Sequence, residues 1–401
     1  MQRRSFLKHA GLGAVAGSAA VAAPVFAQDA PTLNWRMASS FPRSLDTLFG
    51  TGEIFVKFVS EATGGKFNIR QFPGGEIVPA LQVMDAVSNN TIECGHTVSY
   101  YYYGKDPAYC FDSAVPFGLN ARQMNAWMFD GDGMRLTREM FKPLKIVNFP
   151  MGNTGVQMGG WYRKEIKSPE DLKGLKMRTA GFAGEVLSRM GVVPQQLAGG
   201  DVYPSLEKGT LDAVEFVGPY DDEKLGFNKV AKYYYYPGWW EGGPQVSLYL
   251  NEGAWEGLPK SYQAIVEAAS RVAHVAMTSR YDALNPPALR KLIAGGAELR
   301  AFPRSVMDAS YEAALTVYKE FSDKDPKFKA IYENYMGFPR QRGALVPSRR
   351  RVVRPISRRG DGRQEVSRPP FRSGQGPPFG AAPAVWAQRL RRACPLFEQL
   401  C

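Results

Sequence analysis

The sequence has few of the residues that build disulfide frameworks or zinc sites. Its 401 residues include four cysteines and three histidines, and none of the cysteines forms a CxxC pair. A disulfide-stabilised domain has a denser cysteine pattern, and a zinc site needs Cys and His at closer spacing. Cys94 and Cys110 could pair in an oxidising compartment, or each could be a small buried thiol. Under either alternative the chain is not a disulfide scaffold.

Long apolar runs are also absent beyond the N-terminus, where no stretch approaches the roughly 20 apolar residues of a membrane helix. The N-terminus itself has the twin-arginine pattern Arg3-Arg4-Ser5-Phe6-Leu7-Lys8, followed by a weakly hydrophobic run at 11–23 and small residues at 25–27. This order is typical of a cleaved export signal. We therefore expect residues 1–27 to be a twin-arginine signal peptide and the mature protein to be periplasmic.

Acidic residues are scarce at the two ends, which carry formal charges of +3 (residues 1–28) and +11 (residues 339–401) and leave the body between them at −2, for a total of +12. Residues 339–401 contain fourteen Arg, no Lys and nine Pro. Such a segment buries too little apolar surface to offset its chain entropy, so we expect a disordered Arg/Pro-rich tail. Its abrupt start indicates an out-of-frame or foreign terminus. The alternative is a basic tail for nucleic acid or anionic lipid, but no nucleic-acid partner is expected for the body.

The order of predicted elements indicates an α/β fold. Alternating apolar residues predict strands at 33–39 and 67–72, and helical spacing predicts helices at 45–62 and 77–87. This order favours parallel strands covered by helices. The other predicted elements are strands at 92–98, 156–162, 175–179, 211–217 and 245–250, and helices at 184–190, 201–208, 259–283 and 305–321.

The stretch Leu211–Asp222 places a carboxylate in an apolar setting. Glu215 lies in the middle of the predicted strand 211–217. Burying an ionised carboxylate there costs several kcal/mol unless a cation or hydrogen-bond donors stabilise it. Open α/β sheets bind ligands where strand ends face a crevice, so Glu215 is a candidate site residue. The alternative is that Glu215 points into water from an edge strand.

Three more polar residues fall at ends of predicted strands: Gln157, Arg178 and Glu241. The planar guanidinium of an arginine matches a carboxylate through two hydrogen bonds, so Arg178 could bind an organic acid, although alone it could equally form a surface salt bridge. Two carboxylates and an amide oxygen form an all-oxygen set that suits Na⁺ or Ca²⁺.

Long segments that contain these residues resemble the solute receptors of tripartite ATP-independent periplasmic (TRAP) transporters, most closely the branch that binds 2-oxo and 2-hydroxy monocarboxylates. The resemblance runs from Pro31 to Gly337. The segments that carry it are GNTGVQMGGWYRKEI at 152–166, DLKGLKMRTAGFAGEVLSRMG at 171–191, LDAVEFVGPYDDEKLGF at 211–227 and KYYYYPGWWEGGP at 232–244.

The resemblance implies a two-lobed α/β fold of the periplasmic-binding-protein type. Each lobe would be a mixed sheet flanked by helices, with the ligand cleft between the lobes. Residues 28–151 and about 245–283 would form lobe I. Residues 152–244 and about 284–338 would form lobe II.

The resemblance also assigns roles to residues. Arg178 matches the arginine that binds the ligand carboxylate, and the cation ligands would be the side chains of Gln157, Glu215 and Glu241 and the backbone carbonyl of Phe216. Phe216 stands where this branch often has tryptophan and would shape the pocket wall. The resemblance further implies aromatic walls at Tyr101, Phe182 and Tyr220 and a hydrogen bond from Asn153.

The expected function is therefore a receptor that binds a pyruvate-like acid with Na⁺ or Ca²⁺ and delivers it to a membrane permease. No organic cofactor is expected. A rival interpretation is a cation-dependent periplasmic enzyme acting on oxo acids, but the motif segments contain no histidine and the chain has no GxSxG motif. Some members of the branch dimerise through a swapped C-terminal helix. Here the Arg/Pro-rich segment 339–401 stands in place of that helix, so a homodimer is doubtful and exposed apolar surface is expected.

Overall fold

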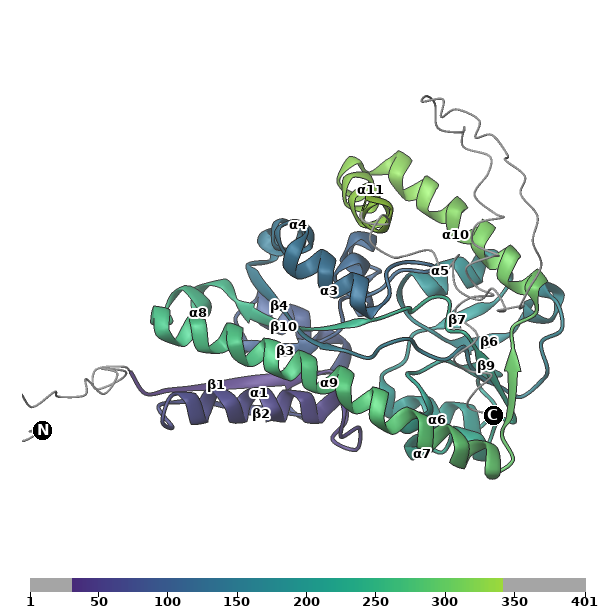
Figure 1. Ribbon diagram of the computed structural model, residues 1–401, viewed down its shortest axis with the longest axis horizontal. Helices are drawn as coiled ribbons and strands as arrows, with labels where there is room; N and C mark the ends of the chain where they lie inside the picture. Colours follow the sequence, from purple (N-terminus) through teal and green to yellow (C-terminus); the bar gives the residue numbers. More distant parts are fainter. Residues whose placement is uncertain (1–30, 342–401) are drawn as a thin grey trace, which may run out of the picture. The chain divides into compact units, whose positions relative to one another are not determined.

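Two β-sheets organise residues 31–341, the part of the chain that the computed structural model describes (Figure 1). The five-stranded sheet has the order β2-β1-β3-β10-β4, and the six-stranded sheet has the order β11-β9-β5-β8-β6-β7. We call the five-stranded sheet with its helices the first lobe and the six-stranded sheet with its helices the second lobe. Both sheets mix parallel and antiparallel pairs, which confirms the expected α/β fold with two mixed sheets.

The first lobe begins with three parallel strands, because α1 and α2 carry the chain back between them. Strand β10 then pairs antiparallel with β3 and β4. Apolar side chains of Phe55, Phe67, Leu248 and Val266 meet in the core. The elements of this lobe are β1 (Leu33–Ser39), α1 (Leu48–Ala62), β2 (Phe67–Phe72), α2 (Val83–Ser88), β3 (Cys94–Thr97), α3 (Ala121–Asp130), α4 (Gly133–Phe141), β4 (Ile146–Asn153), β10 (Gln245–Asn251) and α8 (Glu252–Glu256).

The second lobe has shorter strands, and the parallel pair β6 and β8 lies beside the antiparallel pair β5 and β8 at the centre of its sheet. Its elements are β5 (Gly160–Tyr162), β6 (Lys176–Arg178), α5 (Gly181–Arg189), β7 (Val193–Gln195), α6 (Gly199–Glu207), β8 (Ala213–Val214), α7 (Pro219–Leu225), β9 (Tyr233–Tyr236) and β11 (Glu298–Ala301). Short 3₁₀ helices connect elements in both lobes: η1 (Ala80–Gln82), η2 (Ser99–Tyr102), η3 (Pro107–Asp112), η4 (Lys142–Leu144), η5 (Pro169–Leu172) and η6 (Phe227–Lys229).

Helix α9 (Lys260–Ala294) belongs to both lobes. It packs against α1 and β4 in the first lobe and against α7 in the second, and Figure 1 shows it running past both. The expected lobe boundary between 283 and 284 therefore falls inside one continuous helix, which also passes through Pro286 and Pro287. None of the helices within 31–341, α9 included, combines the length and apolar character that a membrane span requires.

The chain ends its described part with α10 (Arg304–Lys324) and α11 (Pro326–Gln341). Helix α10 packs on α5, whereas α11 packs on α3 and η3. The Tyr335 hydroxyl accepts a hydrogen bond from the Leu119 amide at 3.1 Å. Because α11 reaches Gln341, residues 339–341 at the start of the expected tail are helical. The rest of the expected tail and the signal peptide 1–27 lie outside the described residues.

Several predicted elements differ from the structure. The strand expected at 211–217 is only the two-residue β8, so Glu215 follows the strand instead of lying within it. The strand expected at 156–162 is β5 alone, and the helix expected at 77–87 is divided into η1 and α2. Helices α3 and α4 were not predicted. Cys94 and Cys110 are free and buried, which supports the buried-thiol alternative.

Candidate functional site

Two of the expected site residues lie at the carboxyl ends of neighbouring parallel strands. Arg178 is the last residue of β6, and Glu215 directly follows β8. The two strands pair in the register Arg178 to Val214, and the Glu215 amide donates to the Arg178 carbonyl at 3.1 Å. This edge of the sheet is where α/β proteins commonly bind ligands.

Gln157 and Glu241 come from two loops that connect the lobes, one between β4 and β5 and the other between β9 and β10, and the backbones of these loops are hydrogen-bonded to each other. The Gln157 amide donates to the Glu241 carbonyl at 3.1 Å, and the Gly238 amide donates to the Gln157 carbonyl at 3.0 Å. A Cβ atom at Gly238 would lie 2.6 Å from that carbonyl oxygen, so this close approach requires glycine. All four residues are buried, with exposures between 1% and 3%: Gln157, Arg178, Glu215 and Glu241. We call these four residues the polar cluster.

An ion pair fixes the arginine of the polar cluster. Arg178 Nη1 donates to Glu215 Oε1 at 2.5 Å and to the Glu215 carbonyl at 2.8 Å. Its Nε donates to the Leu197 carbonyl at 3.4 Å, and the guanidinium lies 5.3 Å from the centre of the Phe216 ring. These contacts hold the planar guanidinium in one orientation, as binding a carboxylate requires.

The charges of the polar cluster are not balanced, because two carboxyl groups share one arginine. Burial raises the pKa of Glu215 to about 7 despite the opposing charge of Arg178. Burial, and then the charge of Glu215, raise the pKa of Glu241 well above its ordinary value. Burial alone would lower the pKa of Arg178, but the Glu215 carboxylate raises it. An added positive charge would therefore favour ionisation of both carboxyl groups.

Two oxygen atoms of the polar cluster have no hydrogen-bond partner among residues 31–341. These are Gln157 Oε1 and Glu241 Oε2, both fully buried. Gln157 Nε2 donates to Thr154 Oγ1 at 3.1 Å, which leaves the amide oxygen as an acceptor. Within the same range the structure has no group of three or more His, Cys, Asp and Glu residues that could hold a metal. A cation here would need the amide oxygen and a backbone carbonyl, and the cluster fits a hard cation in that way.

The charges of the polar cluster also affect the pKa values of two tyrosines from the first lobe, Tyr100 and Tyr101. Burial raises the pKa of Tyr101, and the charge of Arg178 opposes this shift. Burial and then the charge of Glu241 raise the pKa of Tyr100 well above its ordinary value. Tyr101 was an expected wall residue, and Tyr100 belongs to the same run of four tyrosines, 100–103, which could be either a ligand wall or packed aromatics. The signal was the tyrosine run after β3, which the sequence alone could not divide into site and packing residues.

Three other expected residues have most of their contacts elsewhere. The Phe182 ring packs against Tyr103, Tyr318, Phe321 and Phe328. The Tyr220 hydroxyl donates to Asp46 Oδ2 at 3.0 Å. Asn153 Nδ2 donates to the Gly243 carbonyl, and Asn153 Oδ1 accepts from the Gly155 amide, both at 2.9 Å. Packing and loop support account for these contacts, so a ligand role for these three residues stays a prediction.

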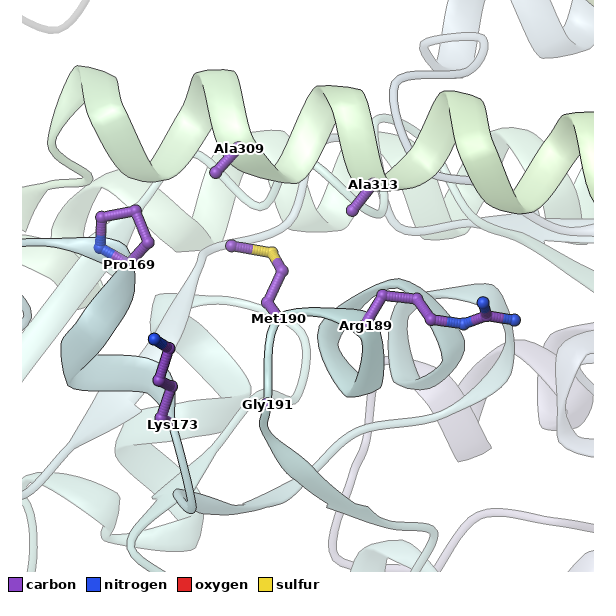
Figure 2. Close-up of a pocket in the computed structure, with 7 residues that line it drawn as sticks. All are labelled: Pro169, Lys173, Arg189, Met190, Gly191, Ala309 and Ala313. Carbon is purple, nitrogen blue, oxygen red and sulfur yellow. The ribbon is translucent and has the colours of Figure 1, made fainter.

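A surface pocket of about 420 Å³ lies apart from the polar cluster, between α10 and the segments that flank α5 (Figure 2). Met190 lies beneath Ala309 and Ala313 of α10, and the Arg189 guanidinium extends away from Lys173. Arg189 is paired with Glu185 at 2.9 Å and with Glu320 at 2.8 Å. This pocket offers one unpaired cation within the described chain, Lys173, and lacks convergent polar groups, so it is not the candidate site.

Comparisons with known proteins identify the family of the chain. The family model described as DctP, bacterial extracellular solute-binding protein family 7, matches residues 38–325. A monocarboxylate 2-oxoacid-binding periplasmic protein from Nostoc sp. is 50% identical over 311 residues, which cover 78% of this chain and 85% of that protein.

Solved structures of TRAP solute-binding proteins are also similar to this chain. A TRAP transporter solute-binding protein from Bordetella bronchiseptica is 56% identical, with a TM-score of 0.77, and the match covers 78% of this chain and 94% of that one. It is a mixed-occupancy dimer with copurified calcium and picolinate in one active site. A TRAP periplasmic solute-binding protein from Pseudoalteromonas atlantica, with bound sodium and pyruvate, is 37% identical, with a TM-score of 0.76 and coverage of 78% and 95%.

Proposed function

The chain belongs to the bacterial extracellular solute-binding protein family 7, and we propose that it is the periplasmic receptor of a TRAP transporter for small 2-oxo monocarboxylates such as pyruvate. As a member of this family it is a solute-binding protein and not an enzyme. Binding would close the lobes over the acid, and the closed form would then be the one that the membrane permease recognises.

The polar cluster supports an acid that is bound together with a cation. Arg178 would bind the ligand carboxylate, since its guanidinium is held in place and charge-assisted hydrogen bonds to carboxylates are strong. Gln157, Glu215 and Glu241, with the Phe216 carbonyl, would hold Na⁺ or Ca²⁺. The cation would neutralise the carboxyl groups and attract the second donor atom of the ligand.

The ligands of the relatives support the 2-oxo acid class. Pyruvate carries an oxygen on the carbon beside its carboxylate, and picolinate carries a ring nitrogen in the same relative position. Both molecules can therefore present a carboxylate oxygen and a neighbouring lone pair to one cation. Tyr101 and the Phe216 ring would enclose the apolar part of the acid, where one methylene changes affinity by only about 1–3 kcal/mol.

The observation that carries the proposal is the shared buried site of two carboxyl groups and one arginine. It is tested by calorimetric titration of the mature protein with pyruvate in Na⁺, in Ca²⁺ and after chelation. We expect binding to require a cation. Glu241→Gln should weaken binding at least about tenfold by removing a charged cation ligand. The control Glu256→Gln, in helix α8 of the first lobe, should bind as the parent does. Equal binding with and without cation would contradict the proposal.

A further inference from the structure

A loop of the first lobe is tied to a helix of the second lobe through one aspartate. Asp46 lies between β1 and α1, and Tyr220 and Lys224 lie on α7. Asp46 Oδ2 accepts a hydrogen bond from the Tyr220 hydroxyl at 3.0 Å, and Asp46 Oδ1 forms an ion pair with Lys224 Nζ. Arg280 of α9 approaches Asp46 Oδ2 to 3.5 Å. One carboxylate thus gathers three donors, two of which belong to the other lobe.

The segment that carries these donors is connected directly to the polar cluster. Helix α7 begins at Pro219, a few residues after Glu215 and Phe216, and the Tyr220 amide is held by Asn285 Oδ1 of α9 at 3.1 Å. A displacement of α7 away from Asp46 would therefore move the loop that holds Glu215. On the other side, Asp46 precedes α1, which packs on β2 and α9.

The surroundings of Asp46 show that the contact is electrostatic and partly hydrated. Burial alone would raise the pKa of Asp46, but hydrogen bonds from Lys224 and Tyr220 hold it below its ordinary value. The side chains of Asp46 and Lys224 remain 45% and 31% exposed. An ion pair with this exposure stabilises only modestly, so it can be broken and remade as the lobes open and close.

We propose that Asp46, Tyr220 and Lys224 form a latch that holds the two lobes together over the polar cluster and sets how fast the bound acid is released. The proposal rests on the proposed function, because it concerns release of that ligand. Asp46 is a positioning residue that acts through α7. Losing the latch lowers the population of the closed form, and the apparent affinity falls in proportion.

The test is the rate of pyruvate release from the Asp46→Asn variant in saturating Ca²⁺, measured by stopped-flow competition. We expect release about 3 to 10 times faster than in the parent, as for loss of an exposed pair with one added hydrogen bond. The requirement for a cation should not change. In a double-mutant cycle, Lys224→Met should speed release little further in the Asp46→Asn background, because the ion pair that it removes is already lost there.

A matched control is available within the first lobe. Asp85 forms an ion pair with Lys105 at 2.5 Å, with side chains 37% and 51% exposed, and both residues precede β4. Asp85→Asn makes the same chemical change without touching the second lobe, so release should match the parent. Equal release rates for Asp46→Asn and the parent would overturn the latch.

Failure of the latch can be separated from failure of the proposed function. If the parent binds no 2-oxo acid, the proposed function is wrong, and the latch is tested by hydrogen exchange without ligand. Asp46→Asn should then speed exchange at 41–50 and 218–226 relative to the parent and to Asp85→Asn. Unchanged exchange in both segments would overturn the latch on its own.

Discussion

Two buried acidic sites, one in each lobe, differ in what surrounds the carboxyl group. In the first lobe, Asp112 Oδ1 accepts hydrogen bonds from Asn148 Nδ2 at 2.8 Å and from Gln245 Nε2 at 3.2 Å. Asp112 Oδ2 accepts from the hydroxyls of Ser247 at 2.7 Å and Tyr249 at 3.3 Å. Each oxygen of Asp112 therefore has two neutral donors, all supplied by the chain.

The polar cluster of the second lobe is not completed in this way. Glu215 and Glu241 share the single cation of Arg178, and Glu241 Oε2 has no partner among residues 31–341. An unsatisfied oxygen alone does not mark a ligand site, because Asn148 Oδ1 and Gln245 Oε1 beside Asp112 also lack a partner there. What distinguishes the polar cluster is two ionisable acids around one arginine. An acid with a structural role, such as Asp112, thus has hydrogen-bond donors from the chain on both oxygens. An acid with a binding role, as proposed for Glu241, keeps an oxygen free for a ligand.

The largest effect should come from removing the arginine of the polar cluster. Arg178→Ala should weaken pyruvate binding at least about 100-fold, because it removes charge-assisted hydrogen bonds to the ligand and leaves Glu215 without its cation. Calorimetry checks this. Arg36→Ala is the matched control, since it removes an arginine–glutamate pair from the first lobe, where Arg36 contacts Glu93 at 3.0 Å.

Loss of folding would give the same result as loss of the binding group, so Arg178→Lys is the second variant. It keeps the charge opposite Glu215 but loses the planar fork, and it should bind more weakly than the parent while staying folded by circular dichroism. Parent-like affinity in both Arg178 variants would place the carboxylate site elsewhere.

The pH dependence of stability should separate the two acidic sites. Burial raises the pKa of Glu215 from 4.5 and that of Asp112 from 3.8, each to about 7. A carboxyl group with a raised pKa in the folded state stabilises below its unfolded pKa and loses that contribution as pH rises through the folded value. Without cation, the free energy of unfolding should thus fall between about pH 5 and pH 7, by up to about 1.4 kcal/mol per pH unit and group.

Ca²⁺ should remove the contribution of Glu215 and Glu241 to the fall of the free energy of unfolding with pH, because binding the cation favours their ionised forms. The contribution of Asp112 to this pH dependence should remain. Urea unfolding at several pH values, with Ca²⁺ and with chelator, measures the two contributions separately. Identical pH profiles in the two conditions would contradict the assignment of the cation to the polar cluster.

The sequence predicted the members of the polar cluster better than their surroundings. Arg178 ends β6 as expected, because a short apolar strand with a polar terminus is a local pattern. Glu215 was placed inside a strand since Phe216 and Val217 extend the apolar run, yet these two residues are buried beside the site without strand pairing. Burial by tertiary packing and burial within a sheet look alike in sequence.

Long-range contacts explain what the sequence could not predict. Asp112 finds its partners at positions 148, 245, 247 and 249, and Asp46 finds Tyr220 and Lys224, so neither contact leaves a local pattern. Phe182 lies in a motif segment, but its ring packs on residues of α10 and α11 far along the chain. The full length of α9 could not be predicted either, because Pro286 and Pro287 indicate a helix end in the sequence.

The smallest effect, and the sharpest test of the comparison, is a pair of amide substitutions in unliganded protein at pH 8. Asp112→Asn should destabilise by about 2 kcal/mol, since it places an amide donor among four donors and loses an acceptor. Glu241→Gln should be neutral or slightly stabilising without cation, because it replaces a buried carboxyl group that has no partner for one oxygen. Both changes are nearly isosteric, so volume does not explain a difference.

Thermal or urea unfolding of the two variants with chelator present measures this difference in sign. Addition of Ca²⁺ should stabilise the parent and Asp112→Asn but not Glu241→Gln, because only the last has lost a cation ligand. Equal destabilisation by both substitutions would mean that Glu241 is a structural acid like Asp112. Two buried acids around one arginine would then not be a sign of binding, and the ligand would have to bind through Arg178 alone.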